Sequence, residues 1–593
     1  MSSSTSSDAE PATSDPTSAP GPEPTPERAP EPSPTPALAQ SEAGVPASRV
    51  TTRGQLWRLT LVCWAWAFLG MFLWSIATPM WAAPDSVAHA VRTYAVGHGD
   101  LTGDRVEGVY MTNTPTPLGL IESAGSVSCL AFQRDTPASC VTMPDPDKTE
   151  LVDYYNPAGR YIPTYYAAVG FPSAWAPLKY TWYAQNFVAA GYASFFVGLA
   201  FAAALTARRR GVALTGVAVA CSPMVLWLGG IANPNSLEIA AAVAMGACTL
   251  VFLREPDSWL GRAMFARAMV AASVMVLVRL IAPMWVGVWF LVFAILAGAA
   301  VWRALGRRRN LAWMGLPVLA TLASGAWTVS SGVEDVGSTP AFDLSWWERL
   351  ELSRMRNDPD TLHEMIGWFG WLDAPLDIRV LELYLWPSLA IVVLAAAFLR
   401  TREVLALAFL GLCTYVLPIV MQAANWNAGG QWWQGRYTLP MMVLIPITAL
   451  WLASERVDVS NRLSPARKLW WMLPLLSLPL AYVQLEAFRT HLRRNVNAGK
   501  GDSALDGPWE PPVNAETWMV GYAVWVVASW LLLLWFLRRD TRRSATPEHP
   551  EAPDSFDTTR TVAAGASEAP APAGDDEVAT TPTTLPPTTP ANA

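Results

Sequence analysis

Residues 81–92 read Trp-Ala-Ala-Pro-Asp-Ser-Val-Ala-His-Ala-Val-Arg, and they follow almost directly on the apolar run 56–78. An apolar helix needs about 20 residues to cross a bilayer, so this junction marks the point where the chain first leaves a membrane. Asp85 is the first acidic side chain after that run. From this junction outward, the sequence predicts an all-α membrane protein.

Further apolar runs of similar length follow, so about 12 transmembrane helices are expected. Large extracytoplasmic loops are expected after the first and seventh spans, at 79–181 and 332–379. The fifth and sixth runs are nearly continuous and are broken only by Arg279 and Pro283, which leaves a re-entrant or shortened pair open. The expected spans are 56–78, 182–205, 211–229, 236–253, 264–280, 283–302, 311–331, 380–399, 403–422, 436–453, 468–486 and 516–537.

The composition supports a membrane domain between two polar tails. The 593 residues are 52% hydrophobic and only 15% charged, whereas soluble proteins carry about a quarter charged residues. Segments 1–50 and 544–593 are rich in Pro, Ser, Thr, Ala and Glu, so they are predicted to be disordered tails around a polytopic domain 51–543. No basic patch with interleaved aromatic residues occurs, so a nucleic-acid partner is not expected.

Basic residues follow every even-numbered span. Because short cytoplasmic loops collect Arg and Lys, this pattern predicts that both termini are cytoplasmic and that the large loops face outward. Only the segment 487–515, with its four basic residues, opposes the trend. Span one is too long and too far from the start of the chain for a signal peptide, and it is predicted to stay in the membrane.

Cys129 and Cys140 are the two of six cysteines that lie in a polar loop, with ten residues between them. If the loop faces an oxidising compartment, these two are expected to form a disulfide. No CxxC motif or Cys/His cluster is present, so the sequence indicates no metal site of that type.

Two interpretations of Asp85 stay open. As the residue before a helix-compatible run, it suits an N-cap whose carboxylate accepts backbone N–H bonds. It also suits a general base that takes a proton from an acceptor hydroxyl. His89 and Arg92, four and seven positions further on, share its helical face, and a simple cap needs no such neighbours.

Two arginines lie at unusual positions. Arg436 is the first residue of span ten, on the expected outer side. It suits either a membrane anchor or a bidentate ligand for a lipid phosphate. Arg279, at membrane depth, is expected to be paired or functional, or to snorkel from a turn. Asn235 or Ser236 is expected to cap the fourth span, which places Glu238 one turn inside the membrane, where a carboxylate needs a partner or a proton.

Three segments carry a family resemblance: 84–99, 367–373 (Gly-Trp-Phe-Gly-Trp-Leu-Asp) and 434–440 (Gln-Gly-Arg-Tyr-Thr-Leu-Pro). They resemble the GT-C superfamily of polytopic glycosyltransferases. More closely, the chain is similar to an uncharacterised family of predicted bacterial membrane proteins that carries a domain-of-unknown-function label. The resemblance covers about residues 55–540 and implies a multi-pass protein of the bacterial plasma membrane.

The resemblance also implies an activity and a set of roles. In GT-C enzymes an acidic residue of the first outer loop is the catalytic base, and the donor is a polyprenyl-phosphate sugar. Asp85 would be the base, and Arg436, beside Tyr437 and with Arg279, would hold the donor phosphate. His89 and Arg92 would orient the carboxylate or bind sugar hydroxyls. Expected partners are membrane lipid, the polyprenyl-phosphate sugar and a glycan or protein acceptor of the cell envelope, with no further cofactor.

The chain departs from the GT-C pattern at two positions. Ser86 stands where a second acid is usual, and Asn235 stands where Asp is common. Asn is the poorer ligand for a hard cation, so metal dependence stays open. Two alternatives also stay open: a transporter or flippase of lipid-linked sugars, and a non-catalytic protein of envelope assembly. Against transport, no internal repeat is visible, and the spans hold few charges apart from Glu238 and Arg279.

Overall fold

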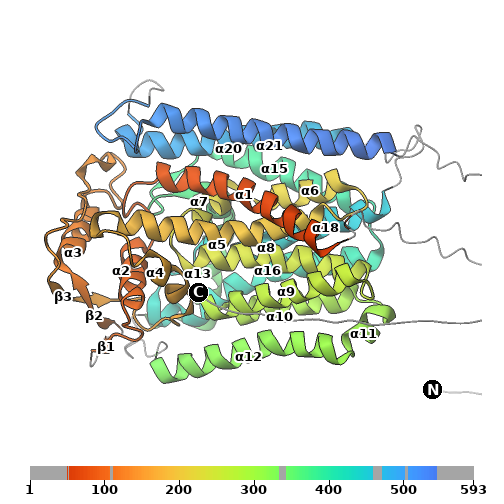
Figure 1. Ribbon diagram of the computed structural model, residues 1–593, viewed down its shortest axis with the longest axis horizontal. Coiled ribbons are helices and arrows are strands. Elements are labelled where there is room, and N and C mark those ends of the chain that lie inside the picture. Colours follow the sequence, from red (N-terminus) through yellow and green to blue (C-terminus); the bar gives the residue numbers. More distant parts are fainter. Residues whose placement is uncertain are drawn as a thin grey trace, which may run out of the picture. The chain divides into compact units, whose positions relative to one another are not determined.

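The fold is a bundle of long helices with a cap of short elements at one end (Figure 1). The structure, a computed structural model, describes residues 50, 52–106, 111–332, 342–457, 470–500 and 505–543. The two predicted tails lie outside the described residues, apart from Val50.

Within the described residues, nine helices are long and apolar enough to cross a membrane. They confirm the predicted all-α membrane fold. They are α1 (Arg53–Ala77), α5 (Thr181–Ala204), α8 (Pro234–Arg254), α9 (Trp259–Val278), α12 (Arg308–Ser331), α15 (Ile378–Ala396), α16 (Thr401–Gly429), the consecutive α17 (Gly435–Met442) and α18 (Leu444–Arg456), and α21 (Ala515–Arg543).

The predicted number of twelve spans is not confirmed. The predicted span 211–229 is a pair of helices, α6 (Arg210–Ala220) and α7 (Pro223–Gly229), bent by 71°, and it makes a tenth span if the pair counts as one. Ser222 caps α7, and Pro223 cannot continue the hydrogen-bond ladder of α6. The predicted span 283–302 divides into α10 (Ala282–Leu296) and α11 (Ala299–Leu305), and 468–486 lies only partly within α20 (Met472–Asn497).

The cap gathers the first large loop beyond the ends of α1 and α5 (Figure 1). Its helices are α2 (Ser86–Gly97), α3 (Leu118–Gly125) and α4 (Thr164–Ser173). Its strands, β1 (Asp104–Arg105), β2 (Thr112–Pro117) and β3 (Leu151–Asn156), form an antiparallel sheet with Thr112 opposite Asn156 and Pro117 opposite Leu151. The second large loop adds α13 (Trp346–Arg356), η4 (Asn357–Thr361), α14 (Leu362–Gly367), β4 (Trp368–Phe369) and β5 (Ala374–Pro375).

Helix α8 forms the centre of the bundle, and every residue from Pro234 to Phe252 is buried. It is rich in alanine, and small side chains let neighbouring helix backbones approach closely in a membrane protein. The same principle acts where α1 crosses α5. A Cβ at Gly198 would lie 2.7 Å from the Cα of Trp64, so only glycine fits there.

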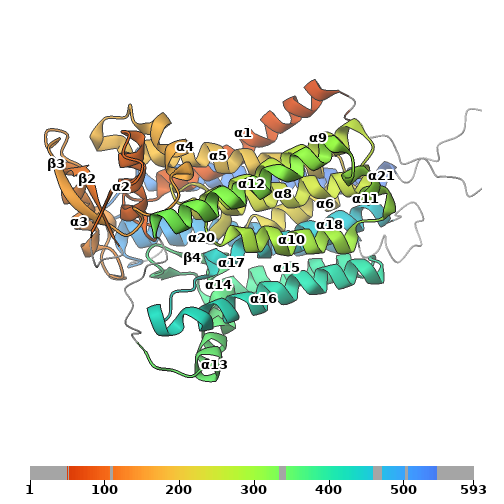
Figure 2. The ribbon, with the colours of Figure 1, turned by 90° about the horizontal axis from the view of Figure 1, so that it is seen from below.

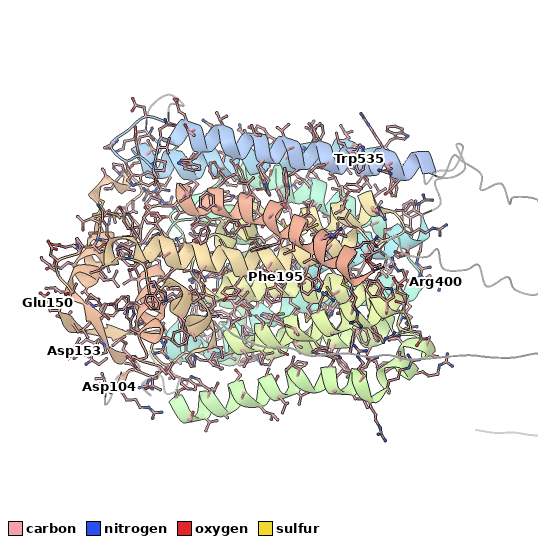
Figure 3. The ribbon with its side chains drawn as sticks, viewed as in Figure 1. Asp104, Glu150, Asp153, Phe195, Arg400 and Trp535 are labelled. Carbon is pink, nitrogen blue, oxygen red and sulfur yellow. A yellow bond between two sulfur atoms is a disulfide. The ribbon has the colours of Figure 1, made fainter. Side chains whose placement is uncertain are left out.

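The two ends of the bundle differ in charge. Figure 3 shows Asp104, Glu150 and Asp153 at the cap and Arg400 at the opposite end. This is the charge distribution expected if the cap faces outward, and the sidedness itself stays a prediction.

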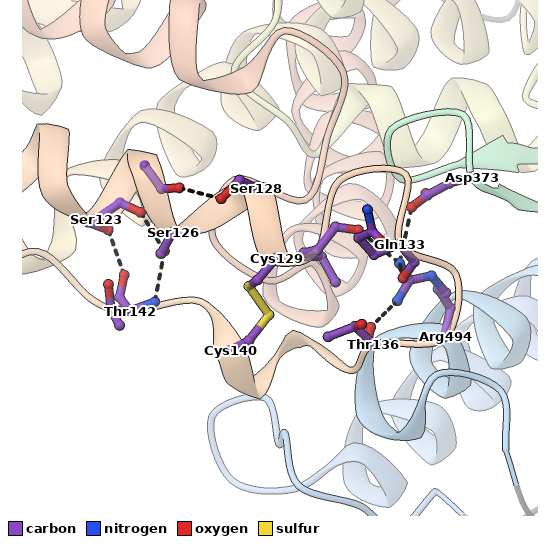
Figure 4. Close-up of a disulfide and its surroundings, with 12 residues drawn as sticks. Ser123, Ser126, Ser128, Cys129, Gln133, Thr136, Cys140, Thr142, Asp373 and Arg494 are labelled. Atoms are coloured by element: carbon purple, nitrogen blue, oxygen red, sulfur yellow. Dashed lines mark hydrogen bonds and ion pairs between the residues drawn. A yellow bond between two sulfur atoms is a disulfide. The ribbon is translucent and has the colours of Figure 1, made fainter.

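The first loop contains a disulfide between Cys129 and Cys140, with their Cα atoms 6.2 Å apart (Figure 4). Arg494, from α20, donates to the carbonyl oxygens of Gln133 (2.9 Å) and Thr136 (2.7 Å) in the segment that the disulfide closes. It also forms an ion pair with Asp373 at 3.0 Å. Lys500 also donates to the first loop, at the carbonyl oxygen of Asp135, so two of the four basic residues of segment 487–515 bind that loop.

Candidate functional site

Asp85 stands at a sharp turn between α1 and α2. Its backbone is left-handed, with φ 58° and ψ 13°, and its side chain makes no capping hydrogen bond to α2. The N-cap interpretation of its carboxylate is therefore wrong. Aspartate is one of the few residue types that tolerates this conformation.

Two distant segments hold the turn in place. Asn233 Nδ2 donates to the carbonyl oxygen of Pro84 at 3.2 Å. Trp371 Nε1, from the second large loop, donates to the carbonyl oxygen of Trp81 at 2.9 Å. The Asp85 carboxylate is thus positioned by the backbone around it and remains available for other contacts.

That carboxylate meets Arg436, a residue 351 positions further along the chain. Arg436 Nη2 donates to Asp85 Oδ2 at 2.5 Å, and also to the Tyr437 hydroxyl at 3.1 Å. The Arg436 side chain is buried (4% exposed), whereas the Asp85 side chain is half exposed (50%). Arg436 Nε and Nη1 are buried and have no partner among the described residues. The guanidinium therefore keeps two N–H donors that no described group satisfies.

Arg279 lies beside the same tyrosine. The guanidinium carbons of Arg279 and Arg436 each stand 5.1 Å from the centre of the Tyr437 ring. Arg279 Nε is also 3.8 Å from Glu238 Oε2. A cation over an aromatic face is attracted by the ring quadrupole, so Tyr437 brings the two positive charges together.

Glu238 has the partner that its membrane depth demands. It is fully buried, and it is paired with Arg279 and accepts a hydrogen bond from Asn235 Nδ2 at 3.3 Å. The expected cap of this helix is wrong by two or three positions. Asn233 caps α8 by accepting from the Asn235 backbone N–H at 3.0 Å, while its own amide holds the Asp85 turn.

His89 lies one turn after Asp85 and is buried, with Nδ1 2.9 Å from the Tyr166 hydroxyl. Burial lowers the pKa of His89 to about 3, so the imidazole is neutral at physiological pH. For Asp85, partial burial raises the pKa, but the charges of Arg436 and Arg279 and the hydrogen bond from Arg436 outweigh it and hold the pKa below its usual value. Asp85 is therefore ionised.

Arg92 is not brought to the carboxylate. It is fully buried, and its Nη2 donates to the carbonyl oxygens of Leu101 (2.5 Å) and Tyr161 (3.3 Å). Its guanidinium also lies 5.7 Å from the Tyr166 ring centre. Arg92 supports the first loop, and its place on the same helical face as Asp85 does not bring its long side chain to the same site.

Glu364 supports the site and was not singled out from the sequence. It accepts from the Gly435 backbone N–H at 2.5 Å and forms an ion pair with Arg356, so it fixes the start of α17, where Arg436 stands. A cavity of about 10 Å³, enough for roughly one water molecule, is lined by Glu364, Gln434 and Arg436. No motif or spacing marks this glutamate.

Among the described residues, no group of three or more His, Cys, Asp or Glu side chains is placed to hold a metal ion. The arrangement is that of a multi-pass α-helical membrane protein with an acid–arginine site beneath its cap. The chain belongs to the family described as "Predicted membrane protein (DUF2142)", whose model matches residues 68–445. This match confirms the predicted membrane family of unknown function, and it contains all three segments that carried the resemblance.

Two solved structures are similar to this chain. One is ArnT from Cupriavidus metallidurans bound to undecaprenyl phosphate, with 14% identity, a TM-score of 0.40, and coverage of 82% of this chain and 78% of that chain. The other is the apo state of the same ArnT, with 13% identity, a TM-score of 0.36, and coverage of 82% and 77%. At TM-scores below 0.5 these similarities support no inference about activity. Comparison with curated proteins gives no match.

Proposed function

We propose that this protein is a membrane glycosyltransferase that moves a sugar from a polyprenyl-phosphate donor to an acceptor hydroxyl on the extracytoplasmic side. The observation that carries the proposal is the Asp85–Arg436 pair. A half-exposed carboxylate stands against a buried guanidinium, two of whose nitrogens have no partner in the part of the chain that the structure describes. Sugar transfer from a lipid phosphate needs these two groups: a base for the acceptor and a cation for the leaving phosphate.

The donor phosphate would bind to Arg436, with Arg279 as the second cation. Arginine presents parallel N–H donors that match two phosphate oxygens, which a lysine cannot do. The Tyr437 ring keeps the two guanidinium groups at equal distances of 5.1 Å from its centre. The positive charge is therefore in place before the donor arrives, and little reorganisation is needed during the reaction.

Donor binding would also activate the base. Without donor, Arg436 holds Asp85 as an ion pair and keeps its pKa low, which makes the carboxylate a weak base. A phosphate that takes over Arg436 neutralises that charge, and its own negative charge then raises the pKa of Asp85. The carboxylate becomes a stronger base only when the donor is bound.

The reaction would be a single displacement. Asp85 accepts the proton of the acceptor hydroxyl, and the acceptor oxygen attacks the anomeric carbon of the sugar. The bond from that carbon to the phosphate oxygen breaks, and the electron pair leaves with the lipid phosphate beside Arg436. One displacement inverts the anomeric configuration. Neutral His89, whose Nδ1 is engaged by Tyr166, would offer Nε2 to a sugar hydroxyl.

The test is mass spectrometry of polyprenyl-phosphate sugars in a deletion strain that carries wild type, Asp85→Asn or Asp153→Asn. Asp153 is an exposed carboxylate on β3 and serves as the matched control. We expect one lipid-linked sugar to accumulate in the deletion strain, to be cleared by wild type and by Asp153→Asn, and to persist with Asp85→Asn. An unchanged lipid pool in all strains would exclude the transferase assignment.

One observation keeps transport as a second candidate: the buried Glu238–Arg279 pair lies at membrane depth, where ionisable groups often mark a transport path. Glu238, however, is in the first turns of α8, which begins at Pro234, whereas transporter sites lie near the middle of the membrane. Full rescue by Asp85→Asn together with failure of Glu238→Gln would move the assignment to transport.

A further inference from the structure

A second, larger site lies at the other end of the bundle. A cavity of about 420 Å³ opens between α1, α5, α9 and α12, helices that run along the same side of the bundle (Figure 2). Its size is within the range of small-molecule sites, roughly 300–1,000 Å³. The cavity has a wall of aromatic and aliphatic side chains, among them Trp57, Phe195, Leu199 and Trp313, and four arginines: Arg53, Arg262, Arg267 and Arg309.

The four arginines carry positive charge that the described residues do not compensate. None of them forms an ion pair in the part of the chain that the structure describes. The carboxylate of Asp257, the nearest acid in sequence to Arg262, is paired with Arg307, and Arg262 Nη1 donates to the Asp257 backbone carbonyl. Among the described residues, no acidic side chain lines the cavity. Four like charges around one cavity repel one another, so an anion there would be bound favourably.

Arg267 is fixed in position at the wall of this cavity. Its guanidinium carbon stands 4.8 Å from the Trp57 ring centre, and Nη1 donates to the Ala263 carbonyl at 2.9 Å. Its Nε is buried without a partner among the described residues. A positive group with a free donor thus stands between an aromatic surface and a basic rim.

We propose that this cavity binds one anionic phospholipid, with its phosphate among the four arginines and an acyl chain along Phe195, Leu199 and Trp313. Basic pockets between transmembrane helices on the cytoplasmic side suit anionic head groups. Every one of the four arginines belongs to the end of the bundle that the basic-residue pattern assigns to the cytoplasm. The site is remote from Asp85 and does not depend on the proposed transfer reaction.

The shape of the cavity favours a lipid over other anions. A free phosphate would use the arginines but not the apolar wall. The acidic segment before α1 is a poorer occupant, because its nearest acid is Glu42, eleven positions before Arg53, and Arg49 lies between them.

The test is native mass spectrometry of the full-length protein in detergent, titrated with phosphatidylglycerol or with phosphatidylcholine. The double variant Arg267→Gln/Arg309→Gln removes two cavity charges. Its matched control, Arg303→Gln/Arg308→Gln, removes two exposed charges at the same end that do not line the cavity. We expect the first double variant to bind phosphatidylglycerol roughly 25-fold more weakly, on the basis of about 1 kcal/mol for each basic residue. The control is expected to bind like wild type.

A second variant keeps every charge. Ala266→Phe fills the cavity from α9 and is expected to weaken phosphatidylglycerol binding with no change in net charge. Equal loss in both double variants, or equal binding of phosphatidylcholine, would overturn the proposal in favour of unspecific attraction. Displacement of the lipid by inorganic phosphate in excess would overturn it in favour of a plain anion site, and gain of lipid binding on deletion of residues 1–49 would assign the cavity to that segment.

Discussion

The protein contains two aspartate–arginine pairs near its cap, and they are built in opposite ways. Arg494 uses both terminal nitrogens for Asp373 and for loop carbonyls, and both side chains are buried (9% and 5% exposed). Arg436 uses one terminal nitrogen, leaves Nε and Nη1 without a partner among the described residues, and faces a carboxylate that is half exposed.

The difference separates a structural pair from the pair that we propose to take part in the reaction. Arg494 joins α20 to the segment closed by the disulfide, and its terminal donors are already engaged (Figure 4). Arg436 and Asp85 keep donors and acceptors for a molecule that is yet to bind. Both pairs place a positive charge on the expected outer side, and Nε lacks a partner among the described residues in both arginines. The terminal nitrogens distinguish the pairs, because both are engaged in Arg494 and only one in Arg436.

The largest expected effect tests the Asp85–Arg436 pair. Arg436→Gln is expected to lower the rate of sugar transfer about 10²–10³-fold, because the leaving phosphate loses a charged donor. Arg436→Lys restores the charge but not the paired donors and is expected to recover only part of the rate. The readout is transfer from the lipid-linked donor in membranes, with the folded amount of each variant measured in parallel. A rate near wild type in Arg436→Gln would contradict the proposed role.

The next effect tests the structural pair. Arg494→Gln leaves Asp373 buried without its cation and is expected to lower the free energy of unfolding by about 3–5 kcal/mol. Denaturant unfolding in detergent, followed by tryptophan fluorescence, measures the change. Arg489→Gln breaks a partly exposed pair with Glu486 on the same helix and is expected to cost about 0–1 kcal/mol. If the two variants lose equal stability, Arg494 is no more structural than a surface arginine.

Removal of the disulfide is expected to have a smaller effect on the same region. Cys129→Ser/Cys140→Ser opens a loop of eleven residues and is expected to lower the free energy of unfolding by about 3 kcal/mol, from the entropy of the unfolded chain. The same unfolding assay applies. Combining this variant with Arg494→Gln sharpens the comparison: because both act on one loop, their effects are expected to sum to less than the separate values.

The smallest effect concerns the pH dependence of stability. The pKa of His89 is about 3 in the folded protein and about 6.5 in the unfolded chain, so the unfolded state binds the proton first as the pH falls. Stability should therefore decrease below pH 6.5, by at most about 1.4 kcal/mol per pH unit for this group. His89→Gln should reduce the loss between pH 6 and pH 5 in unfolding measured at each pH. An unchanged slope would show that His89 is not buried in its neutral form.

Much of the architecture was predictable because bilayer-crossing helices are long and apolar. Hydropathy located the nine long helices, but it does not detect backbone breaks. The extended backbone at Ala297 and Gly298 ends α10 and begins α11, and only the structure shows it. The predicted number of twelve spans therefore stays unconfirmed.

The candidate site was predictable in part. Asp85, Arg279 and Arg436 are conspicuous because charges are rare next to apolar spans, and the structure brings the two arginines to Tyr437 and Asp85 to Arg436. Arg92 was predicted to lie at the site because of its helical spacing from Asp85. That spacing determines the position of the Cα atom but not the position of the guanidinium at the end of a long side chain. Glu364 was not predicted from the sequence, because its contact with Gly435 joins residues 71 positions apart and no local sequence pattern indicates it.

The left-handed backbone at Asp85 has a consequence for how this position can change. With φ at 58°, the turn accepts glycine, asparagine or aspartate far more readily than a longer side chain. Glutamate also carries a carboxylate, yet it would strain the backbone. Its side chain is longer by about one carbon–carbon bond, so the carboxylate would not lie in the same place against Arg436. Of aspartate and glutamate, the turn therefore accepts the shorter aspartate more readily. Replacement of Asp85 by asparagine is expected to abolish the proposed activity while leaving the fold intact.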